Sequence, residues 1–410
     1  MEGESCISKK EVIVAFSFFL LTLERYKFFS ASSGGIKFMH IYYVLIILLF
    51  PLSKIRNARL TKNEILVLVL YLFNLWFSLL VSKNLSKTFL WSFHLSLTLL
   101  GPFLLGIWVR PTLNQLLNGV CLGSVPASLI GLFQLIYYSI YPTLWRYSFY
   151  GGLPRIYGTG YEPGNYAHIL FFGCIPILLH IFYLYKKEKD TPSNMLLLFA
   201  LLNSMILILS TGRTGWLCFF IFCFLCIFHQ PSIKKTKTAI FLIFLFSILT
   251  QVSRSFSKGF FDYFNRNLSA DPRTEGMKIG WEIVKNHPLF GVGLGGFGSA
   301  VKTEIPSYWR NLTSTTEASK IQTLEWDLTP FNSLLEHAIN FGFLGIFWFL
   351  LGNACLLARS DSDADKKIMF FIIISGIAGS LANQNLFRPY FVFIPIMYYG
   401  SKLIDRKRAI

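Results

Sequence analysis

Four arginines stand at the predicted exterior edges of apolar segments, where a charged side chain meets both water and lipid. They are Arg155, Arg213, Arg273 and Arg388. The planar guanidinium of arginine stays charged and can donate two parallel hydrogen bonds to a phosphate group. Arginines at such places can also extend toward lipid headgroups without any role in chemistry. The residue type therefore favours an anion-binding site, with lipid contact as the alternative.

Arg273 belongs to a motif whose local structure strengthens this argument. Asp271-Pro272 predicts a helix N-cap followed by proline at the first helical position, and the helix is expected to end near Asn286. Arg273 then lies in the first turn, beside free backbone N–H groups and the positive end of the helix dipole, which suits an anion. The alternative is a solvated arginine on a loop helix.

Glu162 is the carboxylate best placed to take a proton. It begins a predicted apolar segment and is followed by Pro163. A carboxylate near hydrocarbon holds a proton more readily than one in water, which suits proton transfer. A second interpretation stays open, in which Glu162 only caps the start of a helix. His337 and His168 are weaker candidates, because a histidine on an apolar helix is usually a packing residue, and His287 is expected to be a turn residue.

The glycine-rich segment 291–298 contains the spacing G-x-G-x-x-G, but no strand is predicted before it, which argues against dinucleotide binding. Its glycines are better explained by close packing of two backbone segments, or by a nest of N–H groups for phosphate. No metal site is expected. Cys223 and Cys226 lack a second ligand pair, and no His, Asp and Glu cluster has metal-ligand spacing.

The composition predicts an all-α polytopic membrane protein. Of the 410 residues 53% are hydrophobic, and the mean hydropathy is +0.52. About twelve transmembrane helices are predicted, with ten or eleven as the nearest alternatives. The candidate segments are about 11–30, 37–53, 64–82, 88–109, 117–141, 165–185, 194–210, 215–231, 237–252, 331–357, 368–387 and 389–404.

The formal charge of +17 is divided among short loops, so nucleic acid is not an expected partner. With the long polar stretch set aside, roughly twice as many Lys and Arg fall on one side of the membrane as on the other. The positive-inside rule then places both termini in the cytoplasm. Residues 1–410 are expected to form one integral membrane domain, with 253–330 as its large exterior, periplasmic loop.

Four motifs, taken in order, resemble the O-antigen polymerase and ligase superfamily over about residues 150–350. The segment from Arg273 to Trp281, continued by Asn286 to Phe297, resembles the family's large-loop signature. Pro330-Phe-Asn332, continued by Asn340 to Gly345, resembles its asparagine and glycine-bearing helix. Ser210-Thr-Gly-Arg213 is similar to its turn between two spans, and Tyr161-Glu-Pro is similar to a Glu-Pro segment of polysaccharide polymerases. Ligases of this superfamily carry a histidine before that asparagine, where this chain has Phe331.

The resemblance implies a helical glycosyltransferase that polymerises undecaprenyl-diphosphate-linked repeat units outside the bacterial inner membrane, without a nucleotide sugar, metal or other cofactor. Given this reaction, the chemistry and positions of Glu162, Arg213 and Arg273 make them the candidate catalytic residues. The resemblance makes Arg155, Asn332, Arg388 and His337 candidates for substrate binding. The expected partners are the lipid-linked donor and acceptor, membrane lipids and a chain-length regulator protein.

Two other functions stay open. One is an O-antigen ligase of the same superfamily. The other is a transporter or flippase of lipid-linked sugars, which would share the spans and the arginines. Transporters more often show two repeat halves and helices interrupted near the membrane midplane, and neither is evident here.

Overall fold

The computed structural model describes residues 7–23, 27–29, 36–50, 61–140, 149–150, 153–154, 156, 163–181, 193–210, 213–229, 272–314, 333–360, 362–381 and 389–403. Turns such as 78–84 and 287–296 join the helices, and the regular secondary structure of these parts is helical apart from two short antiparallel hairpins. One pairs β1 (Lys27–Phe29) with β2 (Ile36–Lys37), and the other pairs β3 (Phe149–Tyr150) with β4 (Leu153–Pro154). The predicted helical class is confirmed.

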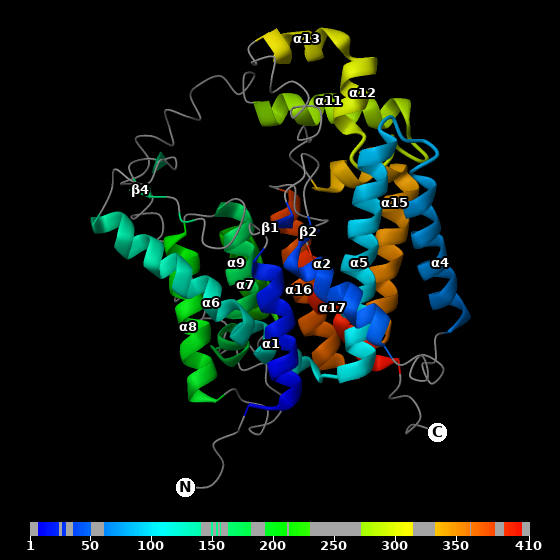
Figure 1. Cartoon of the computed structure of the whole chain (residues 1–410). Helices are drawn as coiled ribbons and strands as arrows, with labels where there is room; N and C mark the ends of the chain where they lie inside the picture. The colour runs from blue at the N-terminus through cyan, green and yellow to red at the C-terminus, as the bar shows by residue number, and fades with distance from the viewer. Residues whose placement is uncertain are drawn as a thin grey trace, which may run out of the picture. The chain divides into compact units, whose positions relative to one another are not determined.

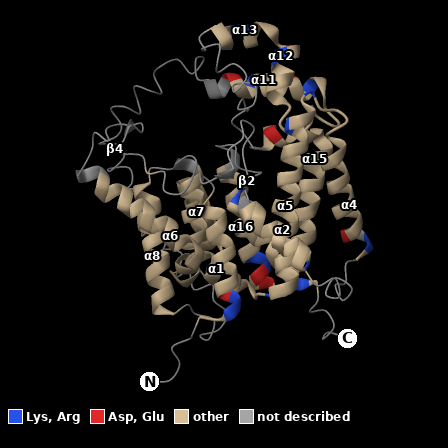
Figure 2. Cartoon of the chain, viewed as in Figure 1, with Lys and Arg blue, Asp and Glu red and all other residues tan. Residues whose placement is uncertain are grey.

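Three helices in the described parts are long and apolar enough to cross a membrane. They span Leu85–Val109, Leu113–Tyr137 and Leu334–Ala358, and in Figure 2 their middle turns are tan, the colour of uncharged residues. Five shorter apolar helices accompany them: Phe38–Leu49, Glu64–Phe77, Asn165–Ile181, Asn194–Leu209 and Thr214–Phe228. The predicted number of twelve spans is therefore not confirmed, and the predicted span 237–252 lies outside the described residues.

The chain divides into two compact units, each assembled from three separate stretches of sequence. Unit 1 contains Met1–Tyr26, Pro111–Ala270 and Ser362–Gly379, and unit 2 contains Lys27–Arg110, Asp271–Asp361 and Ser380–Ile410. Both units thus combine early and late helices. One integral domain over 1–410, with 253–330 as its loop, stays a prediction.

Unit 1 is built around α7 (Pro163–Ile181), which contacts α6 (Leu113–Ile140), α8 (Asn194–Leu209) and α9 (Arg213–Phe228). In Figure 1 these are the teal to green helices. On the other side of α6 lies α1 (Lys9–Thr22), and α16 (Asp363–Leu381) contacts α9 through aromatic rings. Small residues on α6 allow the close approach of α1, because a Cβ at Gly119 would lie 2.9 Å from the Glu11 carbonyl oxygen.

A buried amide joins three of these helices. Asn203 of α8 donates from Nδ2 to Ser124 Oγ of α6 at 2.8 Å and to the Gly173 carbonyl oxygen of α7 at 3.3 Å. Its Oδ1 accepts a hydrogen bond from Ser128 of α6. In a low-dielectric interior a satisfied polar network of this kind fixes the register of helices that are otherwise uniformly apolar.

Unit 2 holds α2 (Phe38–Leu49), α4 (Lys62–Phe77), α5 (Leu85–Val109), α15 (Ser333–Ala358) and α17 (Pro389–Lys402). The α5 helix packs against α2 and α17, and α4 packs against α15. Beyond the ends of α4, α5 and α15 lie three polar helices, α11 (Pro272–Asn286), α12 (Phe297–Glu304) and α13 (Pro306–Ser314), as Figure 1 shows. The α11 helix begins and ends where the sequence predicted.

The turn after α11 is locked to a break in α15. Gly342 has φ 66° and ψ −168°, a conformation that is accessible almost only to glycine. This break lets the Phe343 N–H donate to the Pro288 carbonyl oxygen at 2.8 Å, while the Val292 N–H donates to the Ile339 carbonyl oxygen at 2.8 Å. The glycine-rich segment therefore packs two backbone segments closely, as the first of its two predicted explanations requires, and a phosphate nest there stays a prediction.

We expect Gly342→Ala to lower the free energy of unfolding by about 1–3 kcal/mol from the backbone conformation alone. The added Cβ would also overlap the Leu289 carbonyl group, so the loss should be larger. Gly352 lies in the same helix and has no atom within 4 Å of an added Cβ, so Gly352→Ala should be neutral or stabilise by up to about 1 kcal/mol. Thermal unfolding of both purified variants checks this, and equal midpoints would contradict it.

A buried ion pair holds the other end of α15 to α4. Arg359 donates to both carboxylate oxygens of Glu64, and their side chains are 3% and 7% exposed. Glu64 also accepts from the Thr61 N–H at 2.7 Å in a capping box at the start of α4. The guanidinium lies over the Tyr399 ring of α17, 5.6 Å from its centroid.

Removing one partner of this pair should cost more than removing both. Arg359→Met leaves a buried, uncompensated carboxylate, and we expect a loss of about 3–5 kcal/mol in stability. The double variant Glu64→Gln/Arg359→Met keeps the capping geometry and removes both charges, so it should recover most of that loss. A double-mutant cycle tests this, by comparing the unfolding midpoints of the wild type, both single variants and the double variant. Additive losses would show that the two side chains are not coupled.

Candidate functional site

The helices α7 and α9 of unit 1 begin side by side and run in the same direction. They touch near their starts at Gly215, where an added Cβ would lie 2.7 Å from the Ala167 carbonyl oxygen. About one turn further along α7 and two turns further along α9, the rings of Phe171 and Phe222 meet edge to face with centroids 5.9 Å apart. Contacts in this order require parallel helices, so both N-termini lie at the same end of unit 1.

Two contacts within α9 hold its N-terminus at this place. Trp216 in the first turn of α9 donates from Nε1 to the Leu207 carbonyl oxygen, near the end of α8, at 3.0 Å. That bond ties the start of α9 to the end of the helix that precedes it. Gly215 has no side chain, which allows the close contact with Ala167 of α7.

The last turns of α16 lie at the same end of unit 1. A Cβ at Gly379 would lie 2.7 Å from His168 Nε2 of α7 and 3.3 Å from the Thr214 carbonyl oxygen of α9. His168 is fully buried there. The α16 helix brings the negative end of its dipole, whereas α7 and α9 bring two positive ends. With two positive helix ends and one negative end, the net electrostatic potential at this end of unit 1 is positive, which favours binding of an anion.

Two of the predicted catalytic residues belong in sequence to these paired N-termini. Arg213 is the first residue of α9, and the structure describes its backbone. Glu162 directly precedes Pro163, the first residue of α7, and lies outside the described residues. The order of the chain thus assigns one cation and one carboxylate to the starts of two neighbouring helices. Such a pair could bind an anion and accept a proton.

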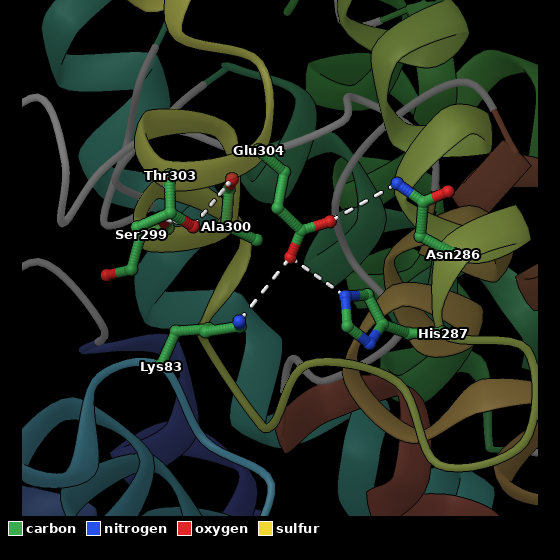
Figure 3. A network of polar contacts seen from close by, with 7 residues as sticks. All are labelled: Lys83, Asn286, His287, Ser299, Ala300, Thr303 and Glu304. Atoms are coloured by element: carbon green, nitrogen blue, oxygen red, sulfur yellow. Dashed lines mark hydrogen bonds and ion pairs between the residues drawn. The ribbon is translucent and has the colours of Figure 1, made fainter.

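A second polar cluster lies in unit 2, at the end of α11 (Figure 3). The carboxylate of Glu304, at the end of α12, contacts His287 Nε2 at 2.8 Å and Lys83 Nζ at 3.7 Å, and it accepts a hydrogen bond from Asn286 Nδ2 at 3.3 Å. The carboxylate is largely buried, with a side chain that is 16% exposed. His287 lies in the turn after α11, as predicted, and its contact with the Glu304 carboxylate is not evident from the sequence.

The other predicted site residues fall in several places. Arg273 is the second residue of α11, and the structure describes its backbone. His337 lies on α15, 1% exposed, with the rings of Phe341 and Phe349 at 5.1 and 5.4 Å. These contacts fit a packing residue, and substrate binding by His337 stays a prediction. Arg155, Asn332 and Arg388 lie outside the described residues.

The middle of the chain matches a known protein family. Residues 198–350 match the family described as O-antigen ligase. The resemblance to the O-antigen polymerase and ligase superfamily is thereby confirmed. A search of curated proteins finds no match. The family and the apolar helices together identify a membrane protein.

The matched O-antigen ligase segment begins within α8 and ends within α15. It therefore includes Arg213, Arg273 and, from the cluster around Glu304, Asn286, His287 and Glu304 itself, whereas Lys83 precedes it. Glu162 and Arg155 precede it, and Arg388 follows it. The α7 helix lies outside the match, but near its start Ala167 packs on Gly215 of α9, which lies inside.

In the part of the chain that the structure describes, no group of three His, Cys, Asp or Glu side chains could hold a metal ion. The described helix ends of unit 1 offer backbone N–H groups instead. These groups can bind phosphate oxygens without a metal.

Proposed function

We propose that this protein polymerises undecaprenyl-diphosphate-linked oligosaccharide repeat units into O-antigen or a related surface polysaccharide. It would act on the periplasmic face of the bacterial inner membrane, with both termini in the cytoplasm. The observation that carries this proposal is the match to the O-antigen ligase family over residues 198–350. The parallel N-termini of α7 and α9 support it, because two positive helix ends and Arg213 suit a phosphate group.

The reaction needs one base and a set of cations. A hydroxyl oxygen of the acceptor sugar bonds to the anomeric carbon of the donor, while the bond from that carbon to the diphosphate oxygen breaks. Glu162 takes the hydroxyl proton, and undecaprenyl diphosphate leaves. Arg213 and Arg273 stabilise the charge that builds on the leaving oxygen.

The remaining candidates bind substrate. Arg155 and Arg388 add positive charge for the diphosphate, and Asn332 and His337 hold sugar groups. A chain-length regulator protein is a further proposed partner.

An O-antigen ligase is the second candidate, and the description of the matched family favours it. A ligase would use the same lipid-diphosphate donor and would differ in its acceptor. Phe331 precedes Asn332 where ligases of the superfamily carry a histidine, and this favours the polymerase.

Deleting the gene and separating the cell's polysaccharide on a gel tests the choice. A polymerase mutant keeps single repeat units attached to their carrier, and the ladder of longer chains disappears. A ligase mutant has no chains attached. A flippase mutant accumulates lipid-linked repeats on the cytoplasmic side, and that result would overturn both enzymatic proposals. Restoring the wild-type gene should return the ladder.

A further inference from the structure

The turn that follows α11 presents apolar side chains outward from a fixed backbone. Pro288, Leu289 and Phe290 are all exposed, with 59% of Leu289 and 38% of Phe290 accessible. The turn is held to α15, because the Pro288 carbonyl oxygen accepts a hydrogen bond from the Phe343 N–H at 2.8 Å. The exposure of these side chains is therefore a defined feature of the fold.

The turn continues the exposed apolar faces of two neighbouring helices. The ring of Phe290 contacts the ring of Phe77 near the end of α4, with centroids 4.9 Å apart. On α15, Phe343 and Phe347 are 48% and 53% exposed. Further exposed apolar residues of α4 and α15 are Leu66, Val69, Phe73 and Leu350. Since α15 is long and apolar enough to cross a membrane, its exposed apolar face suits contact with lipid.

The position of Phe343 along α15 sets the depth of the turn. The apolar segment Leu334–Ala358 has 25 residues, and the polar residues Arg359 and Ser360 follow it. A hydrocarbon core of about 30 Å is crossed by about 20 helical residues. Counted back from Ala358, the core ends near Ala338. Phe343 and the turn bonded to it then lie about five residues, or roughly 7 Å, inside the hydrocarbon.

The backbone of the turn is paired as that depth requires. Irregular backbone is tolerated in hydrocarbon only where protein groups satisfy its hydrogen bonds, because water is absent. In an unbroken helix the Phe343 N–H would donate to the Ile339 carbonyl oxygen. The break at Gly342 frees both groups. The Phe343 N–H donates to Pro288 instead, and the Ile339 carbonyl oxygen accepts from the Val292 N–H at 2.8 Å.

We propose that the turn 288–290 is re-entrant, so that Leu289 and Phe290 lie in the membrane against phospholipid acyl chains. Phospholipid is the occupant because the turn is continuous with the exposed apolar face of a helix that is long enough to cross the membrane. His287 directly precedes the turn and belongs to the polar cluster with Lys83 and Glu304, which suits the level of the headgroups. This inference goes beyond the proposed function, because it needs only the membrane location of the protein.

Photo-cross-linking identifies what contacts the turn. The photoreactive amino acid p-benzoylphenylalanine replaces Leu289, Phe347 or Glu282, one position at a time. Each variant is purified into nanodiscs of phosphatidylcholine with isotopically labelled acyl chains and illuminated, and mass spectrometry identifies the adducts. The yield of lipid adduct at Leu289 should equal that at Phe347, the reference on α15. Glu282 is an exposed carboxylate on α11 and should give little or none.

Two charged substitutions test the depth without a probe. Leu289→Asp places a short carboxylate in hydrocarbon, whereas the long side chain of Leu289→Lys can extend its ammonium to the headgroups. In nanodiscs the unfolding midpoint should fall in Leu289→Asp and stay near that of the wild type in Leu289→Lys. Glu282→Asp and Glu282→Lys are the matched pair at a polar surface position, where substitutions seldom change stability, so their midpoints should agree.

Other results would overturn the inference in distinct ways. A lipid adduct at Phe347 but none at Leu289 would place the turn outside the membrane. An adduct between Leu289 and a second protein molecule would make the turn a protein interface. Loss of the phospholipid adduct at Leu289 when undecaprenyl diphosphate is added would assign the surface to a polyprenyl chain. Equal midpoints for Leu289→Asp and Leu289→Lys would show that residue 289 lies in water.

Discussion

Arg213→Ala is expected to abolish long polysaccharide chains while the protein remains inserted in the membrane. Arg213 is the first residue of α9, at the end where α7 also begins, so its charge adds to two positive helix ends. Loss of a cation that stabilises a leaving diphosphate typically lowers turnover by orders of magnitude. Arg213→Lys should restore chain length only in part, because an ammonium keeps the charge without the two parallel donors. Gel ladders from complemented deletion cells measure the result.

Arg310 provides a control that tests whether the effect depends on the position of the arginine. Arg310 lies on α13, is exposed, and donates from Nε to the Pro306 carbonyl oxygen of its own helix. Arg310→Ala should leave the ladder unchanged, whereas Arg273→Ala should act like Arg213→Ala. Wild-type ladders from both Arg213→Ala and Arg273→Ala, at normal protein levels, would show that these arginines do not bind the diphosphate.

The parts of the fold that could be predicted are those that depend on local sequence. Asp271-Pro272 and Pro288 bracket α11, and its observed bounds are Pro272–Asn286. The glycine-rich segment was expected to pack closely, and it does so against α15. The assembly of each unit from three distant stretches could not be predicted, because it depends on contacts that no local pattern records.

The candidate site also has features that local sequence predicts and features that depend on distant contacts. The positions of Glu162 and Arg213 at helix starts follow from proline, glycine and the change from polar to apolar residues. Nothing in the sequence pairs His287 with Glu304, because they are 17 positions apart and meet only when α12 folds back beside the end of α11.

Glu162→Gln should separate the two interpretations of the carboxylate that precedes α7. Glutamine keeps the size and most of the hydrogen bonding of glutamate, but it cannot take a proton at neutral pH. If Glu162 is the base, turnover should fall by about 10²- to 10⁴-fold while lipid-linked substrate still binds. If Glu162 only caps α7, chain extension should stay near normal, and stability should fall by about 1 kcal/mol instead.

Both quantities must be measured on the same preparation of Glu162→Gln, with Glu282→Gln as the control. Glu282 is an exposed carboxylate on α11, so its replacement should change neither chain extension nor the unfolding midpoint. Near-normal extension by Glu162→Gln would remove Glu162 from the mechanism. His168 would then be the next residue to replace, because it lies on α7 beside Thr214 and the end of α16, at the same end of unit 1. His337 packs among phenylalanine rings on α15 and would follow it.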